Sequence, residues 1–190
     1  IIGHQAGDAL VGGDDNTFIG QSAGGATTAG SWMTIIGRNA GTGVLTAAAT
    51  GTVLVGGGAG AALTEGIGNV AIGYQALDAT ATSDYNTAVG HQALSALTLD
   101  GGTNNTAVGY QALDTDVNGA GSTAIGYHAL HGQESSGTGE VQTGNSAVGY
   151  RAGRFNETGT NNTYLGYQAG AGASNQSNSN NTAVGKDALL

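Results

Sequence analysis

The chain of 190 residues contains no cysteine and no proline, and only four of its residues are Lys or Arg. Without cysteine it can form neither disulfides nor thiolate metal sites, although this absence leaves the redox compartment open. Thirteen acidic residues bring the net charge to −9. Nucleic acids and anionic membrane surfaces both bind proteins through Lys and Arg, so we expect neither as a partner.

Long apolar runs are also missing, and no signal peptide opens the chain. We therefore expect this segment not to span a membrane. The chain starts without Met inside a repeat, at IIGHQAG. We interpret it as a segment of a longer, repetitive protein.

What the chain does contain is one motif, roughly N-T-A-[VI]-G-x-x-A-[LG], repeated over residues 1–190 as a single array. NTAVGHQAL at 86–94 and NTAVGYQAL at 105–113 are nearly identical copies. The coils around residues 31–60 are degenerate copies of the motif but remain recognisable. Eleven units are anchored by a glycine that follows Val, Ile or Leu: Gly3, Gly20, Gly37, Gly56, Gly73, Gly90, Gly109, Gly126, Gly149, Gly166 and Gly185.

The spacings between these anchor glycines are 17, 17, 19, 17, 17, 19, 17, 23, 17 and 19 residues, all odd. Side chains alternate between faces with a period of two along a strand, so insertions in steps of two preserve the inward and outward register. The 37 glycines fit many tight turns between short strands. We predict an all-β parallel β-roll or β-solenoid of about eleven coils of 17–23 residues.

Stacked coils place equivalent residues in columns along the solenoid axis. The first motif position predicts an asparagine ladder, and the fourth predicts an aliphatic ladder that is our candidate core. The asparagines are Asn16, Asn69, Asn86, Asn105, Asn145, Asn162 and Asn181. The aliphatic residues are Ile19, Ile36, Val55, Ile72, Val89, Val108, Ile125, Val148, Leu165 and Val184.

The position after the anchor glycine is aromatic in six consecutive units, which predicts a stacked stripe. Exposed, the stripe would suit the sugar rings of a surface polysaccharide, with neighbouring glutamines bonding the hydroxyls. Alternatively, stacking between coils or packing between chains is its whole purpose. The stripe residues are Tyr74, His91, Tyr110, Tyr127, Tyr150 and Tyr167.

Catalytic and metal-binding machinery is not visible. The four histidines have no recurring carboxylate partner, and no serine stands in a G-x-S-x-G context. We therefore expect no enzyme and no cofactor. The stretches VGGDDNTF at 11–18 and LDGGTNNT at 99–106 resemble calcium-binding β-roll repeats, but their aspartates do not recur, which favours ordinary Asx turns.

One coil buries little by itself, so we expect several chains to associate along their length. NTAVGYQAL and NSAVGYRAG resemble the repeats of trimeric autotransporter adhesin heads, and more closely the T-A-V-G-Y-Q-A-L arrays of phage tail fibres. The resemblance implies a left-handed roll, a homotrimer, and a virion or cell-surface fibre that attaches to a host polysaccharide or outer-membrane receptor. This chain departs from the adhesin heads in its longer period and in Thr or Ser where they carry Val.

Three functions stay open. The first is the structural segment of a phage tail fibre, with a bacterial adhesin head as its variant. The second is a monomeric solenoid that binds an extended lattice such as ice through a threonine ladder, although the 23-residue spacing would interrupt a flat face. The third is a polysaccharide-degrading fibre enzyme, which would need acid pairs shared at the interfaces between chains. The only cluster rich enough in acidic residues to supply them is Asp84, Asp100, Asp114, Asp116, Glu134 and Glu140.

Overall fold

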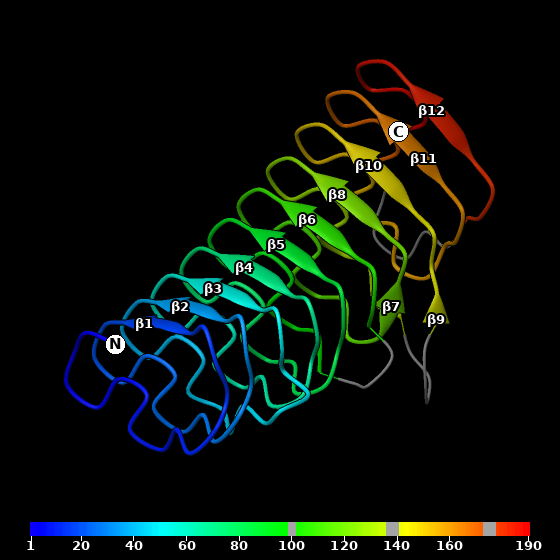
Figure 1. The fold of residues 1–190 in the computed structure, drawn as a ribbon. Helices are drawn as coiled ribbons and strands as arrows, with labels where there is room; N and C mark the ends of the chain where they lie inside the picture. The colour runs from blue at the N-terminus through cyan, green and yellow to red at the C-terminus, as the bar shows by residue number, and fades with distance from the viewer. Residues whose placement is uncertain (99–101, 136–140, 173–177) are drawn as a thin grey trace.

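The computed structural model describes residues 1–98, 102–135, 141–172 and 178–190. In this part of the chain the structure is a parallel β-solenoid without helices, in which one short strand per coil joins a ten-stranded sheet (Figure 1). Its strands are β1 Thr17–Ile19, β2 Thr34–Ile36, β3 Val53–Val55, β4 Val70–Ile72, β5 Thr87–Val89, β6 Thr106–Val108, β8 Thr123–Ile125, β10 Ser146–Val148, β11 Thr163–Leu165 and β12 Thr182–Val184.

The repeat register predicted from the odd spacings is the register of the sheet. Every pairing is parallel and joins equivalent motif positions, as in Thr17 with Thr34 and Thr106 with Thr123. The 23-residue spacing does not interrupt the sheet, since Thr123 pairs with Ser146 like any other neighbours. Its extra residues instead contribute to a second, two-stranded sheet of β7 (Gly119–Ala120) and β9 (Val141–Gln142).

The number of coils is smaller than the eleven predicted. The unit at Gly3 joins the sheet only through an isolated bridge between Ile2 and Ile19. Ten strands follow one another with nine connections between them, which makes about nine turns.

The anchor glycines are required by the close approach of successive coils. Their φ angles lie between +119° and +140°. A Cβ added at any of the first ten would stand 2.3–2.7 Å from the carbonyl oxygen of the anchor glycine in the next coil. No other residue fits this column, because both the backbone angle and the missing side chain are needed.

The predicted core ladder is wrong for the single chain. In each strand of the main sheet the middle residue is buried, and the residues on either side, which include the aliphatic ladder, face outward. Ile72, Ile125, Val148, Leu165 and Val184 are 37–63% exposed. Alternation separates two faces of a strand but does not say which one the turns will cover, and here the turn segments cover the middle residues.

The actual core combines one strand residue and one turn residue per coil, four positions after the anchor. Where the strand residue is alanine, the turn residue is a buried leucine in four coils, Ala71/Leu77, Ala88/Leu94, Ala107/Leu113 and Ala124/Leu130. Where the strand residue is large, the turn residue is glycine, as in Phe18/Gly24, Ile35/Gly41, Leu54/Gly60 and Tyr164/Gly170. At these two positions, eight coils therefore hold one large side chain, supplied from the strand or from the turn, and buried residues such as Met33, Leu45, Leu63 and Leu97 complete the core.

One coil has small residues at both positions, Ala147 and Gly153. A Cβ on Gly153 would lie 2.6 Å from Tyr164 Cδ2 and 2.8 Å from Leu130 Cδ2, so neighbouring coils fill the space. In this coil, the side chains of Leu130 and Tyr164 from the neighbouring coils therefore occupy the space at the Gly153 position.

The asparagine ladder lies inside the corner where each strand begins. Its side chains bond mainly to backbone: Asn86 Nδ2 donates to the Gly102 carbonyl (2.8 Å), and Asn86 Oδ1 accepts from the Asn105 amide (3.0 Å). Each amide thereby satisfies backbone groups that the corner would otherwise leave unpaired in the interior.

Candidate functional site

The aromatic stripe forms one continuous stack on the outside of the turns. Ring centroids of successive residues, from Tyr74 through His91 to Tyr167, lie 5.1–5.4 Å apart. The angles between neighbouring ring planes fall from 30° at the first pair to 9° at the last two. The five tyrosines are 36–55% exposed. All six predicted residues are therefore brought together on one accessible surface.

Stacking limits how the stripe can meet a ligand. At these distances and angles each ring inside the stack covers a face of its neighbours, so ring edges and tyrosine hydroxyls point outward. Sequence reasoning proposed sugar rings on exposed aromatic faces. Within the stack, a glycan would instead contact the row of ring edges and tyrosine hydroxyls. A ring face is open only at an end of the stack.

A second ladder runs beside the stripe, one residue further along each turn. Gln92 Nε2 donates to Gln75 Oε1 (3.3 Å), and Gln111 Nε2 donates to Gln92 Oε1 (3.0 Å). These residues have φ angles of 48–53°, in the left-handed region. The ladder bonds and the stacked rings beside it hold a strained turn in place and give the surface a fixed row of amides.

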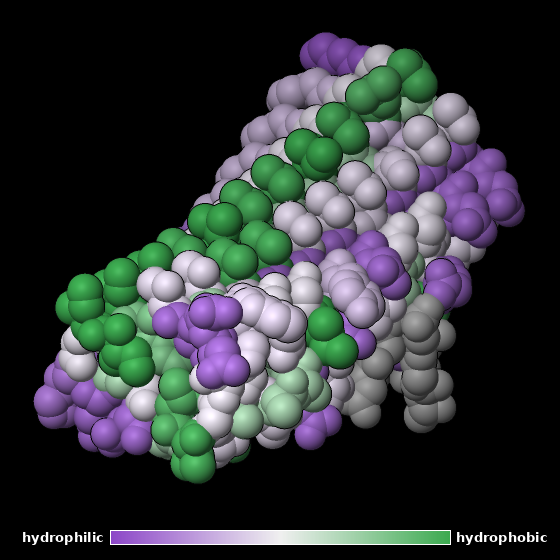
Figure 2. Space-filling model, viewed as in Figure 1, coloured by the Kyte–Doolittle hydropathy of each residue, from purple (hydrophilic) through white to green (hydrophobic). Residues whose placement is uncertain are grey.

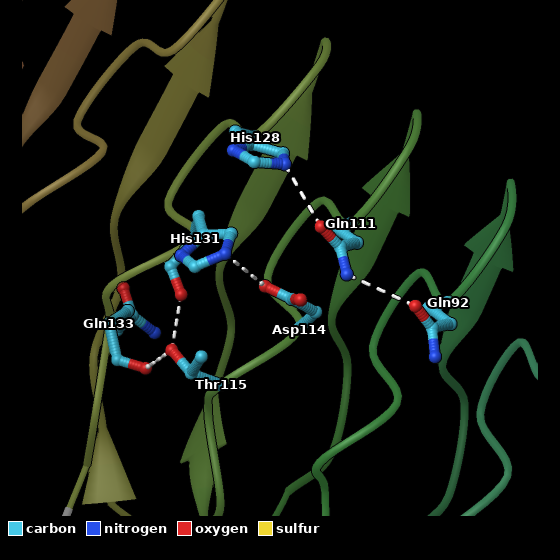
Figure 3. Close-up of polar contacts among 7 residues, drawn as sticks. All are labelled: Gln92, Gln111, Asp114, Thr115, His128, His131 and Gln133. Carbon is cyan, nitrogen blue, oxygen red and sulfur yellow. Dashed lines mark hydrogen bonds and ion pairs between the residues drawn. The ribbon is translucent and has the colours of Figure 1, made fainter.

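His128 continues the glutamine ladder in its own coil. Its Nε2 lies 2.9 Å from Gln111 Oε1, and its ring stacks on Tyr127 at 4.0 Å between centroids (Figure 3). Burial, helped by nearby positive charge on His131, Arg154 and Arg151, lowers the pKa of His128 to about 4. The imidazole is therefore neutral at neutral pH, where Nε2–H can donate to Gln111.

Beside it, His131 and Asp114 face each other across adjacent coils, with 3.6 Å between Nε2 and Oδ1 (Figure 3). Burial raises the pKa of Asp114 to about 7, and burial and the charge of Arg154 lower the pKa of His131. The nearby Thr115 hydroxyl donates to backbone carbonyls of the next coil, including that of Gln133 (3.1 Å). Among the residues drawn, no nucleophile contacts the His131 ring. The cluster is therefore a contact between two turns whose protonation changes with pH.

Two basic side chains of the C-terminal half, those of Arg151 and Lys186, lie along the stripe. The Arg151 guanidinium carbon is 5.0 Å from the Tyr150 ring centroid, and Lys186 Nζ is 5.8 Å from that of Tyr167. Three of the four Lys and Arg residues are in this half of the chain. Arg151 and Lys186 place positive charge beside the aromatic surface of an otherwise acidic protein.

Of the acidic residues considered for hydrolysis, those that the structure describes are not assembled into a site within the chain. Asp116 is fully buried and accepts hydrogen bonds from Gln133, Ser135 and the amide of Gly119 (3.0 Å), so it serves the interior of its coil. Asp84 accepts from the Ile67 amide (2.7 Å). Asp100 and Glu140 lie outside the described residues. In the part of the chain that the structure describes, no three His, Asp or Glu residues are grouped as a metal site.

The aliphatic ladder forms an apolar row along the outer face of the main sheet. Figure 2 shows this row of hydrophobic side chains crossing from one end of the rod to the other. Val89 and Val108 in this row are half-buried, and exposure is highest in the last two coils, at Leu165 (48%) and Val184 (63%). Within the described ranges, no helix has the length and apolar character to cross a membrane.

Sequence reasoning missed one feature, a hollow of about 570 Å³ at the N-terminal end of the aromatic stripe. Gly57 and Gly58 lie in it where the next coil carries Tyr74 and Gln75. The sequence signal that could have predicted the hollow was the presence of glycine at both ladder positions of one coil. That coil was interpreted as a degenerate copy of the repeat.

No protein-family model, curated protein or solved structure matches this chain.

Proposed function

We propose that the chain is a structural segment of an elongated homotrimeric fibre, a phage tail fibre in the first instance, that attaches to a glycan or receptor on a host surface. The observation that carries the proposal is the uninterrupted stack of exposed rings with a parallel row of amides. The solenoid repeats the rings over six successive coils and sets bonded amides beside them at Gln75, Gln92 and Gln111, which suits the repeating units of a surface polysaccharide. Its location would be the virion, or the cell surface if the chain is a bacterial adhesin head.

The apolar row supports the trimeric part of the proposal. Isolated apolar residues on a surface need no explanation, but this row is continuous along the sheet. Three left-handed rolls packed side by side along the row would bury it and leave the aromatic stripes outside. The predicted oligomer then rests on the outward-facing ladder, which was first taken for the core.

The test of attachment compares two tyrosines of the stripe with one tyrosine outside it. Tyr110→Ala/Tyr127→Ala removes two central rings (43% and 39% exposed), whereas Tyr85→Ala removes a ring that is more exposed (55%) but lies outside the stripe. On arrays of host polysaccharides and on intact cells, we expect the double variant to lose binding and Tyr85→Ala to retain it. Equal binding by the double variant and the wild type would refute a role for the stripe.

The test of assembly is the solution mass by light scattering. We expect a mass near three chains, and a monomer for Ile125→Asp/Val148→Asp, which places charge in the row without touching the interior. A folded wild-type monomer would refute the trimer. Circular dichroism of the variant establishes that its β structure survives.

A folded monomer would favour a second function, binding to an extended lattice such as ice. The outer face of the sheet carries Thr, Val or Ser in one column and aliphatic residues in another, and the pairs are in register. The 23-residue spacing, expected to interrupt this face, leaves the sheet continuous. A thermal-hysteresis assay distinguishes this function, because a trimer packed on that face would show none.

A further inference from the structure

The aromatic stripe ends at a coil that has lost two adjacent side chains. Gly57 follows the anchor Gly56, and Gly58 occupies the ladder position of the glutamines. The result is a hollow of about 570 Å³, within the roughly 300–1,000 Å³ range of small-molecule sites. Gly57 and Gly58 lie at its base, and Arg38, Asn39, Tyr74 and Gln75 line it from the coils on either side.

The fold does not require either glycine. Gly57 is not among the residues with positive φ, and its added Cβ would meet Tyr74 Cδ2 at 3.5 Å, an ordinary contact. Gly58 has a φ of +68°, but Gln75 and Gln92 adopt +51° and +53° at the same position. By contrast, a Cβ on Gly56 would lie 2.3 Å from a backbone oxygen. The two glycines therefore leave space that the backbone could have filled.

The space exposes the one aromatic face that stacking leaves open at this end. Tyr74 has the His91 ring on one side, 5.2 Å away, and Gly57 on the other. It is the most exposed tyrosine of the stripe, at 55%. Since coils stack at about 4.8 Å, Arg38 and Tyr74, two coils apart, leave roughly 10 Å between them, which accommodates one ring.

The lining supplies the polar groups that a sugar needs. Arg38 is exposed and forms no ion pair within the described ranges, so its guanidinium is available to a carboxylate. Gln75 Oε1 accepts from Gln92, which leaves its Nε2 hydrogens to donate. Asn39 adds a second amide at the same rim. An aromatic face with amides and one cation is suited to a pyranose ring that bears a negative charge.

We propose that this hollow binds a single acidic sugar ring, with the ring against the open face of Tyr74 and its carboxylate on Arg38. The choice of a sugar rests on the proposed attachment to a surface glycan. The hollow would then be the specific contact at the end of the stripe, and the row of ring edges would extend the contact along the polysaccharide.

The test fills the hollow with side chains taken from the next coil. Gly57→Tyr/Gly58→Gln copies Tyr74 and Gln75, so we expect a melting temperature no lower than that of the wild type. Binding is followed through the amide NMR signals of residues 57 and 58 during titration with glucuronate and, separately, methyl glucoside. The filled variant is monitored through the Tyr74 ring and the Gln75 amide.

We expect glucuronate to shift these signals in the wild type and to bind at least tenfold more weakly to the filled variant. Arg38→Gln should reduce the affinity for glucuronate to that for methyl glucoside, whereas Arg154→Gln, which removes an arginine far from the hollow, should leave it unchanged. Equal affinity of the filled variant, or no shift in the wild type with either sugar, would overturn the inference.

The outcome is distinguishable from that of the proposed function. If the wild type attaches to cells through Tyr110 and Tyr127 but no sugar shifts residues 57 and 58, the hollow is not a site and attachment stands. If glucuronate binds in the hollow and the stripe variants attach like the wild type, the hollow stands and the stripe is structural.

Discussion

In the paired core positions, the large side chain comes either from the strand or from the turn. This complementarity can be tested by moving the large side chain from the strand to the turn in one coil. Leu54 and Gly60 form a large/small pair, and the next coil has the opposite pair, Ala71 and Leu77. Leu54→Ala alone should empty the interior and destabilise the protein by about 2–5 kcal/mol. Gly60→Leu alone places its Cβ 2.6 Å from Leu54 Cδ2, and this overpacking should cost about 1–3 kcal/mol or more.

The double variant Leu54→Ala/Gly60→Leu should recover most of this loss because it rebuilds the Ala71/Leu77 arrangement. The backbone already suits leucine, since Gly60 has a φ of +57° and Leu77 one of +53°. Two costs remain: the left-handed conformation costs leucine about 1–2 kcal/mol, and Gly41, whose added Cβ would be 2.9 Å from Leu54 Cδ1, loses a neighbour. We expect the double variant to lie within about 2–3 kcal/mol of the wild type, with a coupling energy of about 2 kcal/mol.

The assay is urea unfolding followed by far-ultraviolet circular dichroism, with an unchanged dependence on urea as the condition for comparing variants. Leu54→Ala/Gly57→Ala is the matched control, because Gly57 faces the outer hollow and its substitution should add independently. Additive losses in Leu54→Ala/Gly60→Leu would refute the idea that the two positions share one volume.

Three further predictions concern single residues. Burial raises the folded-state pKa of Asp114 to about 7, so its contribution to stability is present below pH 4 and is lost as the pH rises through 7. In urea titrations at pH 8, Asp114→Asn should therefore be more stable than the wild type by about 2 kcal/mol, after allowance for solvent screening. At pH 3.5 the two proteins should be equally stable. The pKa of His128 is lowered to about 4, so its contribution to stability is present above pH 6.5 and is lost as the pH falls through 4. Relative to the wild type, His128→Gln, which continues the glutamine ladder, should be more stable by about 1 kcal/mol at pH 4 and equally stable at pH 8. Higher stability of the variant at both pH values would contradict the lowered pKa of His128. Gly90→Ala sets a Cβ 2.3 Å from the Gly109 carbonyl oxygen at a φ of +140° and should cost about 3 kcal/mol, whereas Gly57→Ala should stay within about 0.5 kcal/mol; similar melting temperatures for both would show that the coils can move apart.

Much of the fold could be read from particular residues. The glycines after each aliphatic residue marked the coils, and the odd spacings predicted that equivalent residues pair in register, as Thr17 and Thr34 do. The aromatic residues at Tyr110 and Tyr127 were expected to stack, and their rings lie 5.4 Å apart. These features depend on local geometry and on a strict period, both of which are visible in one dimension.

The number of coils and the core were predicted less well. Gly3 belongs to the motif, but its unit contributes no strand to the main sheet and pairs with it through an isolated bridge at Ile2. Val89 and Val108 are the more hydrophobic residues of their strands, yet Ala88 and Ala107 occupy the interior. Leu94 and Leu113 enter the narrow interior from the turn and leave room there only for alanine on the strand. The strand pattern by itself does not contain this information.

The sequence by itself determined that this protein is a one-dimensional β repeat, where each coil begins, and which side chains share a column, because these follow from period and parity. Only the tertiary structure decided which column is inside, since the inside is defined by where the turns fold back and not by the strand. It also decided that Gly57 and Gly58 open a hollow beside Tyr74, because an absent side chain becomes a site only when residues from two neighbouring coils surround the space.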